Sequence, residues 1–335
     1  MTNICAVLID DVVKLAAIES SWQELWRRVP TATPFQSPAW LLPWWRSFSP
    51  GELAVVAAWR GGGLVGLLPL YRARAAGEDR ILPLGAGVSD YIDVLLDPRC
   101  GPISIDTLLE PLFQLPWRSH ICIVEDIPPW STALALDPPR RWSHSVEPQN
   151  ACPVLNLSDG IPVGMQRRLR RGARRAERLG GLDIRSIDGG KIDEFLDVLF
   201  LLHGVRWRSR DAQPGVLSDA AVRAFHRNAL PRLGRTGIAR LYELRIGGSI
   251  AGCYYGFFDR GRAYAYIGGF DPCYATVSPG ALLLAHAIEA AQREGGAEFH
   301  FLRGREAYKY EWGAVDHWNR RLCFQSVPTH VDRSA

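Results

Sequence analysis

Residues 263–293 read AYAYIGGFDPCYATVSPGALLLAHAIEAAQR, and this stretch decides the fold. Apolar and aromatic residues in 263–268 predict a strand that ends at two glycines. After a loop, Ser278 precedes Pro279 and Gly280, and an amphipathic run continues over 281–293. Serine is a favourable N-cap and proline suits the first helical position. The stretch therefore predicts a strand, a loop and a long helix.

The start of this predicted helix is a candidate binding site for a phosphate group. A helix N-terminus presents unpaired N–H groups and a partial positive charge, which suits a pyrophosphate. Gly280 leaves room for a ligand to approach the backbone. An ordinary capped helix is the alternative interpretation. Ser278, Pro279 and Gly280, with Phe270 and Asp271 before them, form the predicted donor-binding set.

A second strand signal follows the helix, in the segment 298–304 (EFHFLRG). The alternation places Phe299 and Phe301 on one face of the strand and His300 on the other.

The segment 305–312 (REAYKYEW) carries a cluster of polar side chains. If it is helical, Glu306, Lys309 and Tyr310 lie near one another through i,i+3 and i,i+4 spacing. Acyl transfer needs a base for the attacking group and a donor for the oxyanion. Together with His300, this cluster predicts an acyl-transfer site.

The length of 335 residues favours two domains. A proline-rich stretch over 128–153 is the expected boundary, which gives domains 1–150 and 151–335. Each half runs from helices into a β-meander. Gly62-Gly63 aligns with Gly247-Gly248, each pair between two apolar runs. We interpret the chain as a duplicated α/β unit.

Composition excludes several classes of protein. No apolar run reaches the roughly 18–20 residues that span a bilayer, and the N-terminus lacks the basic region of a secretory signal. The seven cysteines show no C-x-x-C pair, which favours a reducing compartment and no metal site. A net charge of +4 does not indicate nucleic-acid binding. We expect a cytoplasmic protein.

Several motifs together resemble the GNAT-fold acyltransferase family of the cellulose and exopolysaccharide (CelD/BcsL) type. They are HGVRW at 203–207, SPG at 278–280, FLRGREAYKYEW at 301–312, FQSPAW at 35–40 and SDYID at 89–93. The resemblance implies two tandem GNAT-like domains with mixed central sheets flanked by helices. It also implies a layout related to the peptidoglycan-bridge aminoacyltransferases.

The resemblance implies roles for individual residues. The first domain would be a degenerate, acceptor-side unit, and the second would bind the donor and carry catalysis. His300 or Glu306 would be the base, and Tyr308 and Lys309 would orient the carbonyl or protonate the thiolate. The family match adds His203 to the catalytic set. The remaining expected substrate contacts are Asp90, Tyr91, Asp93, Arg206, Trp207 and Arg303.

Two departures from the family pattern bear on these roles. His300 stands where the family usually has aspartate, although an imidazole can also act as a base near neutral pH. The pyrophosphate loop of single-domain GNAT enzymes is replaced by residues 274–280. Acyl-CoA is the expected co-substrate, with an acyl carrier protein or an aminoacyl-tRNA as alternative donors.

Seven arginines between Arg167 and Arg178 occupy one predicted helix with its own apolar stripe. A solvated surface face is one interpretation. Docking of an acidic carrier protein, contact with tRNA, or adhesion to the inner face of an anionic membrane are the others.

Three functions remain open at this point. The first is an N- or O-acyltransferase that acts on a small-molecule, lipid or sugar acceptor, such as a sphingoid base or an exopolysaccharide. The second is a tRNA-dependent aminoacyltransferase, the one case in which we expect nucleic acid as a partner. The third is a non-catalytic GNAT scaffold in polysaccharide or lipid assembly.

Overall fold

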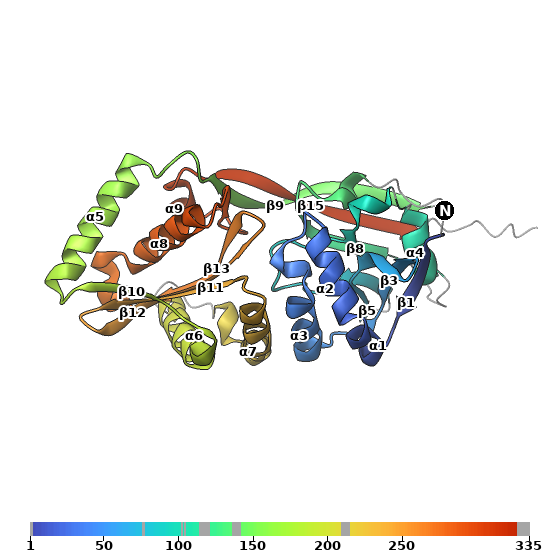
Figure 1. Ribbon diagram of the computed structural model, residues 1–335, viewed down its shortest axis with the longest axis horizontal. Coiled ribbons are helices and arrows are strands. Elements are labelled where there is room, and N and C mark those ends of the chain that lie inside the picture. Colours follow the sequence, from blue (N-terminus) through green and yellow to red (C-terminus); the bar gives the residue numbers. More distant parts are fainter. Residues whose placement is uncertain are drawn as a thin grey trace, which may run out of the picture. The chain divides into compact units, whose positions relative to one another are not determined.

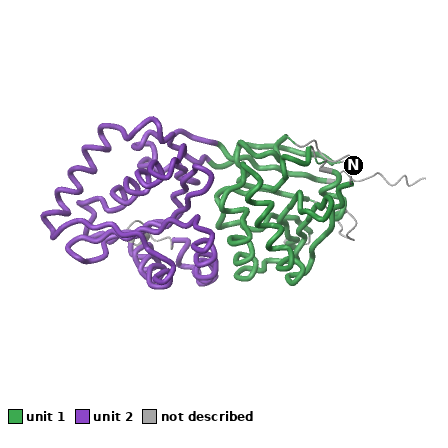
Figure 2. The backbone as a smooth tube through the Cα atoms, in the orientation of Figure 1, with its two compact units in different colours: residues 1–150, 318–335 green, residues 151–317 purple. Residues whose placement is uncertain are grey.

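The computed structural model describes residues 3–75, 78–101, 103, 105–113, 121–135, 142–208 and 215–326. The chain forms two compact units (Figure 2). The first comprises 1–150 with 318–335, and the second comprises 151–317. The division after Asn150 lies inside the stretch expected to hold the boundary. The expected second domain, 151–335, includes the segment from Trp318, but that segment groups with the first unit.

The second unit is a mixed sheet with helices on both faces (Figure 1). Its strands run in the order β10 (Leu182–Ser186), β11 (Ala239–Ile246), β12 (Ser249–Asp259), β13 (Arg262–Phe270), β14 (Glu298–His300) and β9 (Trp142–Asn156). All neighbours are antiparallel except β13 and β14. Its helices are α5 (Val163–Arg178), α6 (Ile192–Arg208), α7 (Ala220–Arg235), α8 (Pro279–Arg293) and α9 (Ala307–Tyr310). Helix α8 covers one face, and α6 and α7 cover the other.

The first unit has two groups of strands. One follows the order β1 (Cys5–Ile9), β3 (Val55–Arg60), β4 (Gly63–Leu68) and β7 (Leu95–Leu96). The other follows β15 (Val315–Ser326), β8 (Ile121–Ile127), β6 (Glu78–Pro83), β5 (Leu70–Ala75) and β2 (Glu52–Leu53). The helices are α1 (Val12–Ala17), α2 (Glu19–Arg28), α3 (Pro38–Phe48) and α4 (Ile105–Phe113).

The two units repeat one element order, which confirms the tandem layout. The antiparallel series β1-β3-β4-β7 corresponds to β10-β11-β12-β13. In each unit, helices follow the first strand of the series. The fourth strand is followed by a helix and then a strand, which are α4 and β8 in the first unit and α8 and β14 in the second. Both central hairpins turn on two glycines with positive φ, 56° and 79° at Gly61 and Gly62, and 56° and 83° at Gly247 and Gly248. These values are those of a type I′ turn. The turn glycines of the first unit therefore lie one position earlier than the sequence alignment placed them.

The expected proline-rich boundary is partly a strand. Strand β9 contains Pro148 and Pro153, and the carbonyl of Pro153 accepts a hydrogen bond from the Phe301 N–H at 2.9 Å. Proline removes a backbone donor but keeps its acceptor, so a strand can contain it where only the carbonyl is needed.

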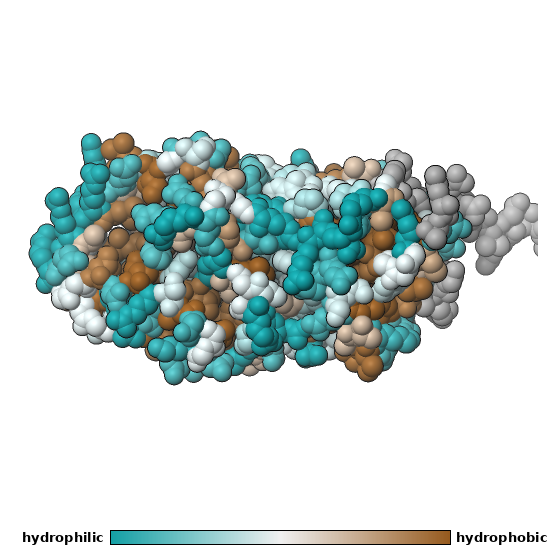
Figure 3. Space-filling model, in the orientation of Figure 1, coloured by the Kyte–Doolittle hydropathy of each residue, from teal (hydrophilic) through white to brown (hydrophobic). Residues whose placement is uncertain are grey.

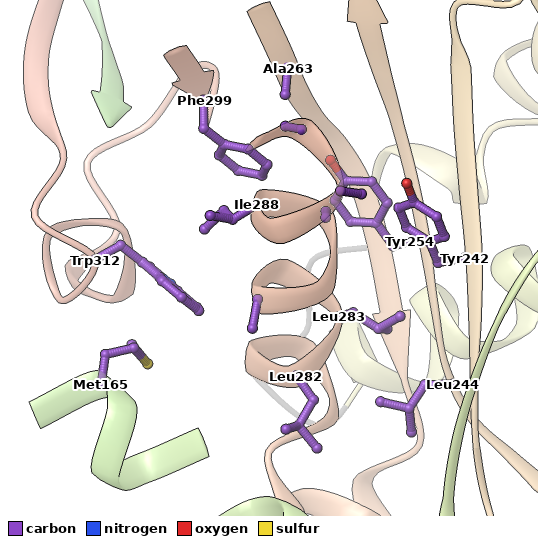
Figure 4. Packing of buried hydrophobic residues seen from close by; sticks show 14 of the residues in the cluster. Met165, Tyr242, Leu244, Tyr254, Ala263, Leu282, Leu283, Ile288, Phe299 and Trp312 are labelled. Carbon is purple, nitrogen blue, oxygen red and sulfur yellow. The ribbon is translucent and has the colours of Figure 1, made fainter. Parts of the chain in front are cut away.

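The core of the second unit lies between the sheet and α8 (Figure 4). Phe299 and Phe301 both belong to it, with ring centroids 5.1 Å apart, which confirms that they share a face. Trp312, which follows α9, and Met165 of α5 both point toward α8. These two side chains bring α5 and the α9 segment into the same core as α8.

Candidate active site

The second unit contains a cavity of about 240 Å³ on the α8 side of its sheet. Its walls are formed by strands β12 and β13, the start of α8, the first two turns of α5 and the α9 segment. Its lining includes Met165, Arg168, Cys253, Tyr254, the residues 265–270, Ala275, the residues 278–281, Leu283, Leu284, Tyr308 and Trp312. The predicted donor-binding residues Phe270, Ser278, Pro279 and Gly280 are all among them.

The cavity exists because β13 continues beyond the point where its pairing with β14 ends. Strands β13 and β14 pair only from Arg262 to Tyr264, and in the described part of the unit β14 ends at His300. The register between β12 and β13 also shifts by one residue, with Tyr266 as the extra residue. A bulge of this kind bends a strand and increases its twist. The side of β13 beyond Tyr264 therefore faces the cavity instead of another strand.

The start of α8 is built differently from the expected cap. Ser278 is the N-cap, but its backbone is left-handed, with φ 61° and ψ 58°, and its side chain makes no capping hydrogen bond. A serine cap normally adopts an extended backbone that directs its oxygen to the N–H groups. Pro279 occupies the first helical position as predicted. Within the described chain, the Gly280 N–H has no acceptor and the Ser278 hydroxyl has no partner, and both residues line the cavity.

Asp271 is the one member of the predicted donor set that does not line the cavity. It is the N-cap of the 3-10 segment Pro272–Val277, where its side chain accepts from the Cys273 N–H at 2.9 Å. Its carboxylate therefore shapes the loop that leads into α8.

Helix α5 is fixed against this loop by a glycine. A Cβ added to Gly172 would lie 2.4 Å from the carbonyl oxygen of Val277, so only glycine permits this approach. Arg175 also donates to the carbonyl of Thr276 at 2.6 Å. At the cavity, Arg168 forms an ion pair with Glu311 at 2.6 Å. Helix α5 is thus a wall of the site.

We predict that Gly172→Ala destabilises the protein by roughly 1–3 kcal/mol, because the added methyl must displace backbone. Gly164→Ala is the matched control on the same helix, since a Cβ there meets nothing within 4 Å. Chemical denaturation measures both variants. Equal stability of the two would show that the α5 contact contributes nothing.

Tyr308 is the predicted catalytic residue that the structure brings to the cavity. It is half-buried, and its ring meets the edge of Phe301 with centroids 6.4 Å apart. The residue belongs to α9, so this helix supplies part of the cavity wall.

Lys309 and Glu306 do not line the cavity. The Lys309 ammonium is buried and donates to the carbonyls of Leu302, Arg303 and Gly304 at 3.1, 2.7 and 3.0 Å. It also pairs with Glu306 at 3.0 Å, so the expected contact between these two is present. The ammonium therefore supplies hydrogen bonds to the carbonyls of this loop and does not face the cavity. Arg303 lies in that loop, and it too is absent from the cavity lining.

His300 is also held away from the cavity. It pairs with Tyr264 in register, and the two rings stack at 4.9 Å. Since Ala263 and Phe299 face α8, strand alternation places Tyr264 and His300 on the opposite face. Its Nε2 lies 3.1 Å from the Glu298 carboxylate. Burial lowers the pKa of His300, and Glu298 opposes that shift.

His203 lies on α6, directly behind the strand that lines the cavity. A Cβ added to Gly269 would lie 2.7 Å from the His203 backbone nitrogen. Gly268 and Gly269 therefore separate the cavity from α6 without any side chain of their own. Burial lowers the pKa of His226, on α7, to about 3, and the nearby His203 adds to that shift. The side chains of Arg206 and Trp207 lie outside the described residues.

Of the predicted substrate contacts of the first unit, Tyr91 and Asp93 are buried and Asp90 is half-buried. Tyr91 is fully buried between Phe35 and Trp130. The Asp90 carbonyl accepts from the Asn319 amide at 3.0 Å. Asp93 accepts from the Ser131 hydroxyl at 2.5 Å and the Val94 N–H at 2.8 Å.

Because Asp93 is buried, we predict that the stability of the protein depends on pH. Burial raises the pKa of Asp93 from 3.8 to about 7, and its two hydrogen bonds reduce that shift. The folded state therefore holds a proton that the unfolded state loses, so stability falls as pH rises from about 4 to about 7. Asp93→Asn should remove this slope and be more stable than the wild type at pH 8. Urea titrations at several pH values measure it, and an unchanged slope in the variant would contradict the prediction.

Sequence reasoning missed several walls of the cavity. Tyr254, Cys253 and Tyr266 lie in strands, where nothing in the pattern separates a cavity wall from core. Burial raises the pKa of the Cys253 thiol to about 12, so it is inert at neutral pH. The inserted position of Tyr266 depends on a register shift that one strand's sequence does not reveal.

In the described chain, no helix combines the length and apolar character needed to cross a bilayer. Among the same residues, no group of three or more His, Cys, Asp or Glu is placed to hold a metal ion.

The sequence of the second unit matches a known family. Residues 164–310 match the family model described as acetyltransferase (GNAT) domain. This part of the chain is a GNAT domain. The chain is accordingly an enzyme of the acyltransferase class. No curated protein matches the sequence.

Solved structures similar to this chain extend the likeness to both units. FemX matches with a TM-score of 0.64 at 10% identity and covers 92% of this chain and 96% of its own. The C-terminal domain of a putative lysylphosphatidylglycerol synthetase from Agrobacterium fabrum matches with 0.58 at 12% identity, covering 93% of each chain. The L-PGS structure from Bacillus licheniformis matches with 0.57 at 14% identity, covering 87% and 88%. At these identities the likeness establishes a shared fold.

Proposed function

We propose that this GNAT protein transfers an acyl group from a pantetheine thioester to an amine or hydroxyl of a lipid- or sugar-type acceptor. The observation that carries the proposal is the cavity. At one end it offers the Gly280 N–H and the Ser278 hydroxyl to an anion, and elsewhere it presents the Tyr308 side chain. Leu283, Leu284 and Trp312 add apolar side chains to the lining. A pantetheine arm with a phosphate at one end and a thioester at the other fits this arrangement.

The reaction is a direct attack. The acceptor nitrogen or oxygen bonds to the thioester carbonyl carbon, the C–S bond breaks, and the sulfur leaves as a thiolate. The Tyr308 hydroxyl protonates this thiolate, and a base takes the proton of the attacking group. Backbone N–H groups of β13 beyond Tyr264, where β14 no longer pairs, would stabilise the carbonyl oxygen as it becomes negative.

We assign the base to His203. It is buried and does not line the cavity, but its backbone lies against Gly269, which does, so it would serve an acceptor that enters from the α6 side of the sheet. His300 is fully buried on the sheet and bonded to Glu298.

His203→Gln should lower kcat by about 100-fold, the lower end of what a positioned base contributes. His300→Gln is the matched control and should keep most of the turnover of the folded enzyme. Steady-state release of free thiol measures both, with thermal melting to confirm folding. Loss of turnover in His300→Gln alone would assign the base to His300.

The donor site can be tested by filling it. Gly280→Val places a branched side chain at the cavity and should abolish thermal stabilisation by coenzyme A. Gly164→Val changes the same helical position in α5, where the space is open, and should leave that stabilisation intact. If coenzyme A and long-chain acyl-CoA both fail to stabilise the wild type, the pantetheine proposal is wrong.

The acceptor class is supported by the motif resemblance to the exopolysaccharide (CelD/BcsL) type and by one structural neighbour. The name lysylphosphatidylglycerol synthetase describes a product in which a lipid carries an aminoacyl group. We propose sphingoid-type amines and polysaccharide hydroxyls as the first acceptors to assay. A lipid acceptor would place the protein in the cytoplasm at the inner face of the membrane.

Aminoacyl transfer from tRNA is the second candidate. The fold likeness to FemX and to two lysylphosphatidylglycerol synthetase structures, each over at least 87% of this chain, favours it. Binding of an aminoacyl-tRNA that weakens steeply with salt would support it. Indifference to tRNA at low salt would remove it.

A further inference from the structure

Helix α5 carries a row of arginines that the cavity does not use. Arg168 pairs with Glu311, and Arg175 donates to the Thr276 carbonyl. The remaining five are exposed, and in the described chain their side chains make no hydrogen bond or ion pair. We call these five the outer arginine face: Arg167, Arg170, Arg171, Arg174 and Arg178.

The excess charge of the second unit is concentrated on this helix. Outside α5, residues 151–317 contain 17 basic and 17 acidic residues, whereas α5 contains seven arginines and one glutamate. Figure 3 shows hydrophilic side chains along the edge of the molecule formed by α5. The positive field of this unit therefore centres on one helix about 24 Å long, at 1.5 Å for each of its 16 residues.

The apolar side of α5 is already occupied. Met165, Gly172 and Ala176 are buried against the loop before α8 and the core. A membrane-surface helix instead uses its apolar side to enter the lipid boundary. The outer arginine face can therefore attract an anionic partner, whereas the exposed apolar side chains Val163 and Leu179 lie at opposite ends of α5 and form no stripe for insertion.

The same helix borders the cavity. Met165 and Arg168, in its first two turns, line the cavity, and the Arg168–Glu311 ion pair lies at that border. A partner bound along α5 would hold a flexible arm close to the cavity.

We propose that the outer arginine face docks a small acidic carrier protein that presents the acyl thioester on its phosphopantetheine arm. This rests on the proposed function, because the arm must enter the donor cavity. A single basic helix suits a partner with one acidic face, because complementary charges set orientation and association rate. An RNA would be held through many phosphate contacts, and the surface outside α5 offers no net positive charge for them.

The test measures binding separately from catalysis. Fluorescence anisotropy follows a labelled holo acyl carrier protein against the wild type, against R167Q/R171Q/R174Q/R178Q, and against R27Q/R46Q/R235Q/R293Q. The last variant removes the same charge from exposed arginines on α2, α3, α7 and α8. We expect the α5 variant to bind about tenfold more weakly at low salt, the loss of four exposed ion pairs. The control variant should stay within about twofold of the wild type.

Coenzyme A binding, measured on the same preparations, separates the two proposals. Retention of coenzyme A by the α5 variant shows that its fold and cavity are intact. Loss of carrier-protein binding with coenzyme A retained supports the docking surface. Two results would overturn the docking surface alone. In one, the wild type binds coenzyme A but does not bind the carrier protein. In the other, carrier-protein binding weakens equally in both arginine variants. Failure of the wild type to bind coenzyme A counts against the proposed function itself. Tight binding of uncharged tRNA, lost only in the α5 variant, would assign the face to RNA and overturn the carrier proposal.

Discussion

Tyr308→Phe should lower kcat for acyl transfer by about 100-fold, the lower end of what a positioned proton donor contributes. The phenol is the titratable side chain that α9 brings to the cavity, and phenylalanine keeps its shape while removing the proton. KM for the donor should change little, because the ring that lines the cavity remains. Initial rates of thiol release over a range of donor concentrations measure both constants.

The control for this prediction lies two residues away. Tyr310 also belongs to α9, but its hydroxyl donates to Asp316 at 2.6 Å and it does not line the cavity. Tyr310→Phe should keep turnover within a few-fold of the wild type. If the two variants lose activity equally, the effect comes from α9 itself and Tyr308 is not the proton donor.

Lys309→Met should destabilise the folded protein by about 3 kcal/mol, because three carbonyls lose a buried charged donor. The ammonium holds the loop 302–304 in place, and that loop contains two residues with positive φ, Leu302 at 60° and Gly304 at 106°. Methionine fits the same volume without a donor. Denaturant titration gives the change in free energy of unfolding.

Glu306→Gln provides the comparison for Lys309. The Glu306 side chain is 55% exposed, so its ion pair contributes at most about 1 kcal/mol. A stable Lys309→Met variant that loses only kcat would show that the ammonium acts on the substrate, as the sequence resemblance suggests.

Local patterns predict much of this fold. The glycine pairs at the hairpins, the proline at the start of α8 and the shared face of Phe299 and Phe301 all depend on neighbours within a few residues. The duplicated order follows from the same local signals. Residues 263–293 form β13, a short loop segment and α8 in the expected order.

The chemistry at the site was harder to predict, because it depends on which face of the sheet holds the cavity. Alternation separates His300 from Phe299, but it does not say which side meets a ligand. The cavity lies on the α8 side, so His300 faces away from it and Tyr308 reaches it. Similarly, i,i+3 spacing brings Glu306 to Lys309, yet only the loop carbonyls explain why the ammonium is buried.

A second source of error is long-range contact. Gly172 lies in a run of arginines, and no local pattern indicates that it permits α5 to contact the Val277 carbonyl. Asp93 follows a turn-like Ser-Asp pair, but it is buried against Ser131. In each case the partner is far away in the sequence, and one chain alone gives no sign of it.

The most direct test of the donor site is a crystal structure of the protein grown with millimolar coenzyme A. We expect the pantetheine arm in the cavity between β13 and α8, a phosphate within hydrogen-bond distance of the Gly280 N–H, and the sulfur near the Tyr308 hydroxyl. Coenzyme A bound at any other place, or a cavity that stays empty at this concentration, would contradict the account.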